Sequence, residues 1–177
     1  ALTRDGVSIP VLAKVGSRDE TKLDMENGAD GVGLYRIEQA SLGRQKPPSA
    51  EELFDEMRRT LKPAKGKSVC VRLLDIGADK HAGPDAIRCN NPALGLRAVR
   101  LCLKNLSLFR PQLRAILRAS AHGPVRMMVP MLSNTQELHQ VLSLVNDIRN
   151  ALQRESLAFA PDMQIGAMIE VPAAALS

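Results

Sequence analysis

Strand-like and helix-like stretches alternate along this chain, and that alternation is the feature that most limits its fold. Short apolar segments with β-branched side chains occur at 11–16, 31–38, 125–132 and 164–171. Another begins at Val69, within residues 69–80. Helix-like segments separate them, at 17–29, from Ser49 to about Leu61, at 94–104, at 107–121 and from Asn134 to about Glu155. Repeated strand–helix units predict parallel strands joined by helical crossovers, and therefore an α/β fold.

Two architectures satisfy this pattern. One is an open, doubly wound sheet, and the other is part of a (β/α)8 barrel. The strands are mostly continuous apolar runs, which predicts a sheet buried on both faces. A complete barrel needs about 250 residues, so a chain of 177 residues with five strands would form a partial TIM barrel, with residues 1–177 as a single domain.

Charged residues gather where three of the strands end. In parallel α/β folds the functional site lies at the carboxyl ends of the strands, so these residues are expected to converge there. Ion pairs that close the ends of the sheet, Arg36 with Glu38 or Arg72 with Asp75, are the structural alternative. The set comprises Arg36 and Glu38 at the end of the second strand, Arg72 in the third with Asp75 and Lys80 just beyond, Arg97 near the start of the following helix, and Glu170 at the end of the fifth.

These residue types indicate an anion site. The planar fork of arginine binds phosphate or carboxylate oxygens bidentately and stays charged when partly buried. Several arginines at one point suit a small, multiply anionic ligand. Glu170 is the candidate ligand for a divalent metal, because Mg²⁺ prefers a few carboxylate oxygens together with substrate phosphate.

Composition excludes several classes of function. The net charge of +5 conceals a basic block between Ala86 and Gln136 that contains eight basic residues and no acidic one. Such a block indicates an anionic partner or a solvated basic face. With one Tyr, three Phe and no Trp, the chain lacks the aromatic platform that single-stranded nucleic acid needs.

No apolar run reaches the roughly 18 residues of a membrane span, and no secretory signal is evident. The three cysteines, Cys70, Cys89 and Cys102, have no metal-ligand spacing and are expected to be free thiols in a reducing cytoplasm.

Six ordered motifs give the chain a family resemblance. They are "GADGVGLYRIE", "VRLLDIGADK", "NPALGLRAVR", "RPQLRAILRAS", "VPML" and "IEVPAA", from about Val11 to Ala175. In this order they resemble the phosphoenolpyruvate-binding barrel of enzyme I of the bacterial sugar phosphotransferase system. Pyruvate phosphate dikinase and phosphoenolpyruvate synthase have similar barrels.

The resemblance implies a Mg²⁺-dependent transferase reaction in the cytoplasm. The phosphoryl group of phosphoenolpyruvate (PEP) would pass to a histidine on another domain and then to a histidine-containing phosphocarrier protein of sugar uptake. Arg36 and Arg72 would hold the phosphate, with Arg97 as a further positive contact. Asp75 and Lys80 would support the phosphate site, and Glu170 would bind Mg²⁺. The barrels of this family also form homodimers, so a homo-oligomer is implied.

Three positions depart from the family motifs. Ile37 and Leu73 replace threonines, and Lys14 stands where the family usually has asparagine. We expect these changes to remove polar groups from the mouth of the site.

Other family residues have no counterpart in this sequence. The second metal carboxylate, the acid–base cysteine and the phosphohistidine domain lie outside it, and neither the three cysteines nor His81, His122 and His139 lie in a matching motif. We therefore expect the fragment alone to be inactive and of low stability.

Three hypotheses follow. The first is the PEP-binding part of a PEP-protein phosphotransferase, or of a related dikinase or synthase. The second is a non-catalytic barrel fragment that dimerises or binds a partner, because an unclosed sheet exposes strand edges. The third, binding of the basic block to duplex nucleic acid, would show steep salt dependence.

Overall fold

The fold is built around one sheet of five parallel strands. The computed structural model describes residues 2–41, 46–77 and 94–176. The strands are β1 Leu12–Val15, β2 Gly31–Arg36, β3 Val69–Arg72, β4 Val125–Val129 and β5 Ile165–Ala167. They pair in the order β1-β2-β3-β4-β5. This sequential order, without the reversal of a doubly wound sheet, is that of consecutive barrel units, so the α/β prediction with five parallel strands is confirmed.

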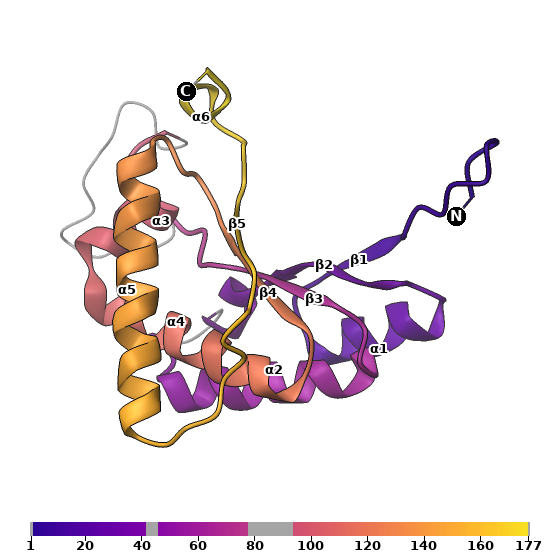
Figure 1. The fold of residues 1–177 in the computed structure, drawn as a ribbon, viewed down its shortest axis with the longest axis horizontal. Helices are drawn as coiled ribbons and strands as arrows, with labels where there is room; N and C mark the ends of the chain where they lie inside the picture. The colour runs from indigo at the N-terminus through magenta and orange to yellow at the C-terminus, as the bar shows by residue number, and fades with distance from the viewer. Residues whose placement is uncertain (1, 42–45, 78–93, 177) are drawn as a thin grey trace.

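The helices α1 to α5 connect successive strands, and α1, α2, α4 and α5 lie along one side of the sheet (Figure 1). Two 3-10 turns, η1 Ile37–Ser41 and η3 Ser120–His122, adjoin the ends of β2 and α4. The α-helices are α1 Arg18–Glu26, α2 Ala50–Ala64, α3 Ala98–Lys104, α4 Leu106–Ala119, α5 Thr135–Arg154 and α6 Pro172–Leu176. None of the helices in the described ranges is both long and apolar enough to cross a bilayer.

The helix starts follow local capping chemistry. Ser49 and Glu52 form the predicted capping box, in which each side chain satisfies a backbone N–H of the other. Asn134 caps α5, as predicted, and Ser17 caps α1. These side chains accept hydrogen bonds from N–H groups that the first turn of a helix leaves unpaired. The predicted start at 94 was wrong, because α3 begins at Ala98 with Arg97 as its N-cap.

The sheet is not buried on both faces, and that prediction was wrong. Along β3, Val69 and Val71 are buried, whereas Cys70 and Arg72 between them are partly exposed. β4 alternates in the same way, because successive side chains of a strand point to opposite faces. One face is covered by the helices, and the opposite face carries the more exposed residues.

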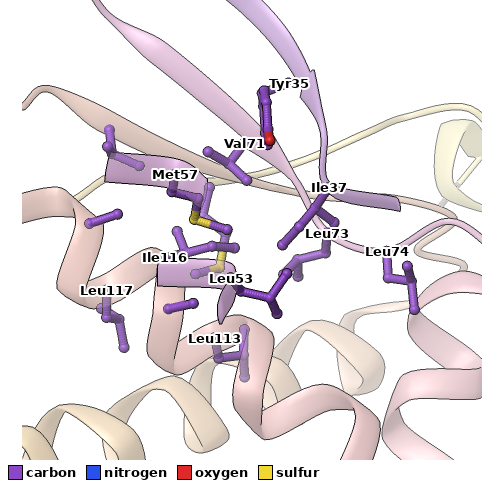
Figure 2. Close-up of a cluster of buried hydrophobic side chains, with 14 of the residues drawn as sticks. Tyr35, Ile37, Leu53, Met57, Val71, Leu73, Leu74, Leu113, Ile116 and Leu117 are labelled. Carbon is purple, nitrogen blue, oxygen red and sulfur yellow. The ribbon is translucent and has the colours of Figure 1, made fainter. Parts of the chain in front are cut away.

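The covered face forms the main hydrophobic core. In Figure 2 side chains from β2, β3 and the segments after them, including Tyr35 and Val71, lie opposite side chains of α2 and α4. From the helices, Leu53 and Met57 on α2 and Leu113 on α4 are all buried. The core extends to Leu74, beyond the end of β3, and so supports the segment where charged residues were predicted to converge.

Candidate functional site

Two arginines lie side by side at the carboxyl ends of β2 and β3. Arg36 and Arg72 are the last residues of their strands and are paired in register. Tyr35 and Val71, which precede them, are buried beneath the helices. Because strand side chains alternate, both arginines point to the opposite face of the sheet. Like charges at paired positions are unfavourable, so this arrangement requires compensating anions.

Protein carboxylates compensate Arg72. Its guanidinium is paired with Glu38 and, through Nη1, with Asp75 Oδ2 at 3.2 Å. The turn η1 brings Glu38 back over β3, so the partner of Glu38 is Arg72 and not Arg36. The predicted alternative of an Arg72–Asp75 ion pair is therefore present, whereas the structure records no pair between Arg36 and Glu38.

Arg97 extends this arrangement to α3. Its Nη2 and Nε donate to Asp75 Oδ1 at 2.8 and 3.1 Å. An antiparallel bridge between Gly77 and Arg97 fixes the backbone at the same place. We call the chain of ion pairs Glu38–Arg72–Asp75–Arg97 the charge network. The side chains of Arg72 and Asp75 are each only 13% exposed, so water screens their interaction less than that of a surface pair.

Arg36 stays outside the charge network. Among the described residues no carboxylate pairs with it, and its Nε is buried without a hydrogen-bond partner. The Nε of Arg72 and the Oε2 of Glu38 are also buried and unpaired. Because the network itself holds equal numbers of positive and negative groups, the charge of Arg36 has no counter-ion among the residues that the structure describes. The two unpaired Nε–H donors, one on Arg36 and one on Arg72, suit an anion with several oxygen acceptors.

Of the two remaining predicted site residues, one lies outside the described residues and the other has a separate contact. Lys80, like His81 and Cys89, lies outside the described residues. Glu170 follows β5 at the same edge of the sheet, and its Oε1 accepts a hydrogen bond from the Met131 N–H at 2.8 Å. The structure thus brings together Arg72, Asp75 and Arg97 by contact and Arg36 by strand register, and it records no ion pair between Glu170 and the network.

Comparison with known proteins identifies the family. The family described as "PEP-utilising enzyme, PEP-binding domain" matches residues 1–177. The chain belongs to this family. A phosphoenolpyruvate-protein phosphotransferase of Bacillus sp. (strain S) is 40% identical over 176 residues, covering 99% of this chain and 30% of the relative.

Other relatives carry the same name. In Staphylococcus carnosus (strain TM300) the identity is 42%, with 99% of this chain and 31% of the relative covered. In Bacillus subtilis (strain 168) it is 38%, with 99% and 31% covered. The relatives are thus named as transferases, and the chain spans about 30% of the length of the first of them.

Two departures from the family motifs prove to be core substitutions. Ile37 and Leu73 are each 1% exposed and belong to the main hydrophobic core. Their side chains lie with those of α2 and α4 in Figure 2. The expectation that they remove polar groups from the mouth of the site was therefore wrong. Lys14 does lie on the side of the sheet that carries Arg36, one strand away on β1, and adds positive charge there.

Mg²⁺ has an incomplete set of ligands in this part of the domain. Glu38 and Asp75 are engaged by arginines, and one oxygen of Glu170 accepts an amide hydrogen bond. Across residues 2–41, 46–77 and 94–176 no group of three metal-ligating side chains is close enough to hold a metal ion. The residues present fit only a Mg²⁺ ion that takes most of its ligands from phosphate and water.

Three arginines of the basic block, all on α4, have carboxylate partners. Arg110 pairs with Asp147 at 3.9 Å, and Arg114 donates to Glu155 at 3.1 Å. Arg118 pairs with Glu51 and lies 4.0 Å from the centroid of the Phe54 ring. Hydrogen bonds from Arg118 and Arg114 lower the pKa of Glu51 and of Glu155, respectively. These arginines join α4 to its neighbouring helices, which weakens the case for an extended anion-binding surface.

Both described cysteines are free thiols. Burial raises the pKa of Cys102 to about 12 and also raises the pKa of Cys70. A nucleophilic or acid–base cysteine needs an accessible thiolate at neutral pH, so neither residue is an activated one.

Sequence reasoning missed Gln112, a buried polar residue that contacts the segment after β3. A signal was available, because Gln112 lies on the apolar side of α4, beside Leu113 and one turn from Phe109 and Ile116. A polar residue on such a stripe is a candidate for a specific hydrogen bond.

Proposed function

We propose that this domain binds the phosphate of PEP at the carboxyl ends of β2 and β3. The observation that carries the proposal is the register pairing of Arg36 with Arg72, together with their unpaired buried Nε atoms. Two adjacent guanidinium groups can each donate two hydrogen bonds to the oxygens of one phosphate. Such charge-assisted hydrogen bonds are stronger than neutral ones.

The residues have distinct roles in this proposal. Arg36, free of protein carboxylates among the described residues, gives its whole fork to the ligand. Arg72 shares its fork between the ligand and the charge network. Asp75 and Arg97 hold Arg72 in place, and Lys80 contributes a further positive charge from the sequence motif. Phosphoryl transfer depends mainly on positioning and on neutralising negative charge, which is the work these groups do.

The reaction that we propose for a protein of the relatives' full length is transfer of the PEP phosphoryl group to a histidine and then to a histidine-containing phosphocarrier. The names of the relatives support it. In that reaction the bond from phosphorus to the enolate oxygen breaks and a phosphorus–nitrogen bond to histidine forms. Glu170 would supply one carboxylate oxygen to Mg²⁺, which when bound helps to neutralise the phosphate. Sugar uptake, a cytoplasmic location and a homo-oligomeric state belong to the same proposal.

The test is calorimetric titration of the chain with PEP and Mg²⁺, comparing wild type with Arg36→Met. This variant is preferred because it leaves no protein carboxylate of the charge network unpaired. We expect Kd to rise by roughly tenfold or more, the value of a lost charge-assisted hydrogen bond. Arg126→Met is the matched control, since Arg126 occupies the same face of the sheet near the opposite end of β4.

The controls decide what each result means. Circular dichroism first establishes that all three proteins are folded. Equal affinity in wild type and Arg36→Met would contradict the proposed phosphate site. An equal loss in both variants would mean that only the overall positive charge of the face matters.

A further inference from the structure

Gln112 is a buried amide in an apolar stripe. It is 3% exposed on α4, where Phe109, Leu113 and Ile116 are completely buried. A buried amide without partners costs free energy, whereas one that is fully hydrogen-bonded fixes the geometry around it. Its partners therefore reveal which part of the fold it fixes.

The three contacts of Gln112 lie on the segment after β3, on its own helix α4 and on α3. Its Oε1 accepts from the Leu74 N–H at 3.0 Å. Its Nε2 donates to the Leu108 carbonyl at 2.9 Å and lies 3.9 Å from Cys102 Sγ. A backbone N–H can only donate and a carbonyl can only accept, so these partners require an amide with its oxygen toward Leu74.

Leu74 immediately precedes Asp75, the central carboxylate of the charge network. On either side the backbone is held by other bonds: the Leu73 N–H donates to the Met128 carbonyl and the Ile76 carbonyl accepts from Ala98, both within 3.0 Å. Between these two points, the bond from Leu74 to Gln112 is the one that ties the segment to α4. Through Cys102, the same amide touches α3, the helix that Arg97 caps.

We infer that Gln112 is a positioning residue that sets Asp75 against Arg72 and Arg97. It does so by locking the segment after β3 and the helix α3 to the same side chain. Its effect on PEP rests on the function proposed above, whereas its effect on the charge network does not. Gln112 acts through Asp75 and has no contact with the ligand in this inference.

The test compares Gln112→Met with Ser120→Ala in the full chain. Methionine keeps the length and apolar packing of glutamine but removes the bond to Leu74. Ser120 is the matched control, because it too is buried at α4 and accepts from a distant backbone N–H, that of Ala160 at 2.9 Å. Ser120 and Ala160 are distant in sequence from the residues of the charge network. Loss of their bond should therefore lower the free energy of unfolding without altering the network.

Three measurements distinguish a positioning role of Gln112 from an effect on protein stability alone. In Gln112→Met we expect the Leu74 amide to exchange with solvent about tenfold faster, measured by NMR relative to the Met127 amide. The Arg97 Nε–H signal should shift, and the Kd for PEP should rise by roughly fivefold. Ser120→Ala should lower the unfolding temperature and leave all three readouts at their wild-type values. Gln112→Glu, which keeps an acceptor for Leu74, should restore protection of that amide.

The outcomes distinguish the inference from the proposed function. Unchanged Leu74 exchange and an unchanged Arg97 signal in Gln112→Met would overturn the positioning role, whatever happens to stability. If the wild-type chain does not bind PEP, the proposed function fails, and the amide and arginine signals still decide whether Gln112 sets the network. If Gln112→Met does not fold, the wild-type chain still tests the inference, because exchange of the Leu74 amide as fast as that of an exposed amide would show that its bond to Gln112 does not hold the segment.

Discussion

The two faces of the sheet differ although they share the same strands. On β4, Met127 faces the helices and is 1% exposed, whereas its neighbour Met128 faces the other way and is only partly buried. On β3, Val71 belongs to the core and Arg72 to the charge network. Alternate residues of one strand therefore differ in role: those on the covered face stabilise the core, and those on the other face form the charge network at which we propose that PEP binds. The comparison teaches that mutations of neighbouring residues, about 3.3 Å apart along a strand, should have separable effects.

The sharpest test of this difference uses the two methionines. Met127→Ala should lower the free energy of unfolding by about 2–5 kcal/mol, because it removes a fully buried side chain and leaves a cavity. Met128→Ala should cost much less, since that side chain is partly exposed. Urea denaturation of both variants measures the difference. Equal losses would mean that the open face is packed as tightly as the covered one.

Tyr35, the only tyrosine of the sequence, reports on the covered face. Burial raises its pKa from 10.0 to about 12. In the unfolded chain the phenol ionises near pH 10, so its contribution to stability is fully present below pH 10 and is lost as pH rises toward 12. Absorbance titration at alkaline pH should give a midpoint near 12 in the native protein and near 10 in urea. Tyr35→Phe should remove this part of the pH dependence, and a native midpoint near 10 would contradict the burial.

Removing Arg72 should affect both stability and binding. Arg72→Met leaves Glu38 and Asp75 short of a partner, which should cost about 1–3 kcal/mol in the free energy of unfolding, and it should also weaken PEP binding. The double variant Arg72→Met/Glu38→Gln should regain part of the stability, because the unpaired charge is gone, while binding stays weak. Urea midpoints and calorimetry together check this. Recovery of binding in the double variant would show that Arg72 serves the fold alone.

Glu51 on the outer surface of the helices should have the smallest effect. Its pKa is lowered, chiefly by the hydrogen bond from Arg118. Its contribution is therefore present above the unfolded pKa and lost as pH falls through the folded one. With the side chain 68% exposed, solvent screening should keep the contribution below about 1 kcal/mol. Unfolding temperatures of wild type and Glu51→Gln should differ slightly at pH 7 and coincide at strongly acidic pH.

Local chemistry made the starts of α2 and α5 predictable. Ser49 and Asn134 cap helices through bonds within a few residues, so short patterns in the sequence were sufficient. The ends of strands were less predictable. Glu38 lies in a 3-10 turn rather than in β2, and β5 ends at Ala167, three residues before Glu170. Tertiary contacts decide where a strand stops, and a single sequence does not contain them.

The sequence predicted which residue types form the candidate site, but it did not predict which of these residues form ion pairs with one another. Arginines at strand ends indicated an anion site, but the partner of Glu38 depends on the register of β2 against β3. The orientation of Ile37 and Leu73 depends on the same geometry, because both follow the strand ends and turn into the core. Gln112 acts over 38 positions of sequence, a distance at which pattern alone carries no information.

The sequential strand order also bears on how the chain assembles. Each strand pairs with the strands that come immediately before and after it in the sequence, from β1 to β5. Pairing between neighbouring units closes shorter loops than pairing between distant ones, which lowers the entropic cost of each step. During synthesis each new strand–helix unit can therefore dock on the edge of the previous one as it leaves the ribosome. The same arrangement that places the arginines side by side allows the sheet to grow in the direction of translation.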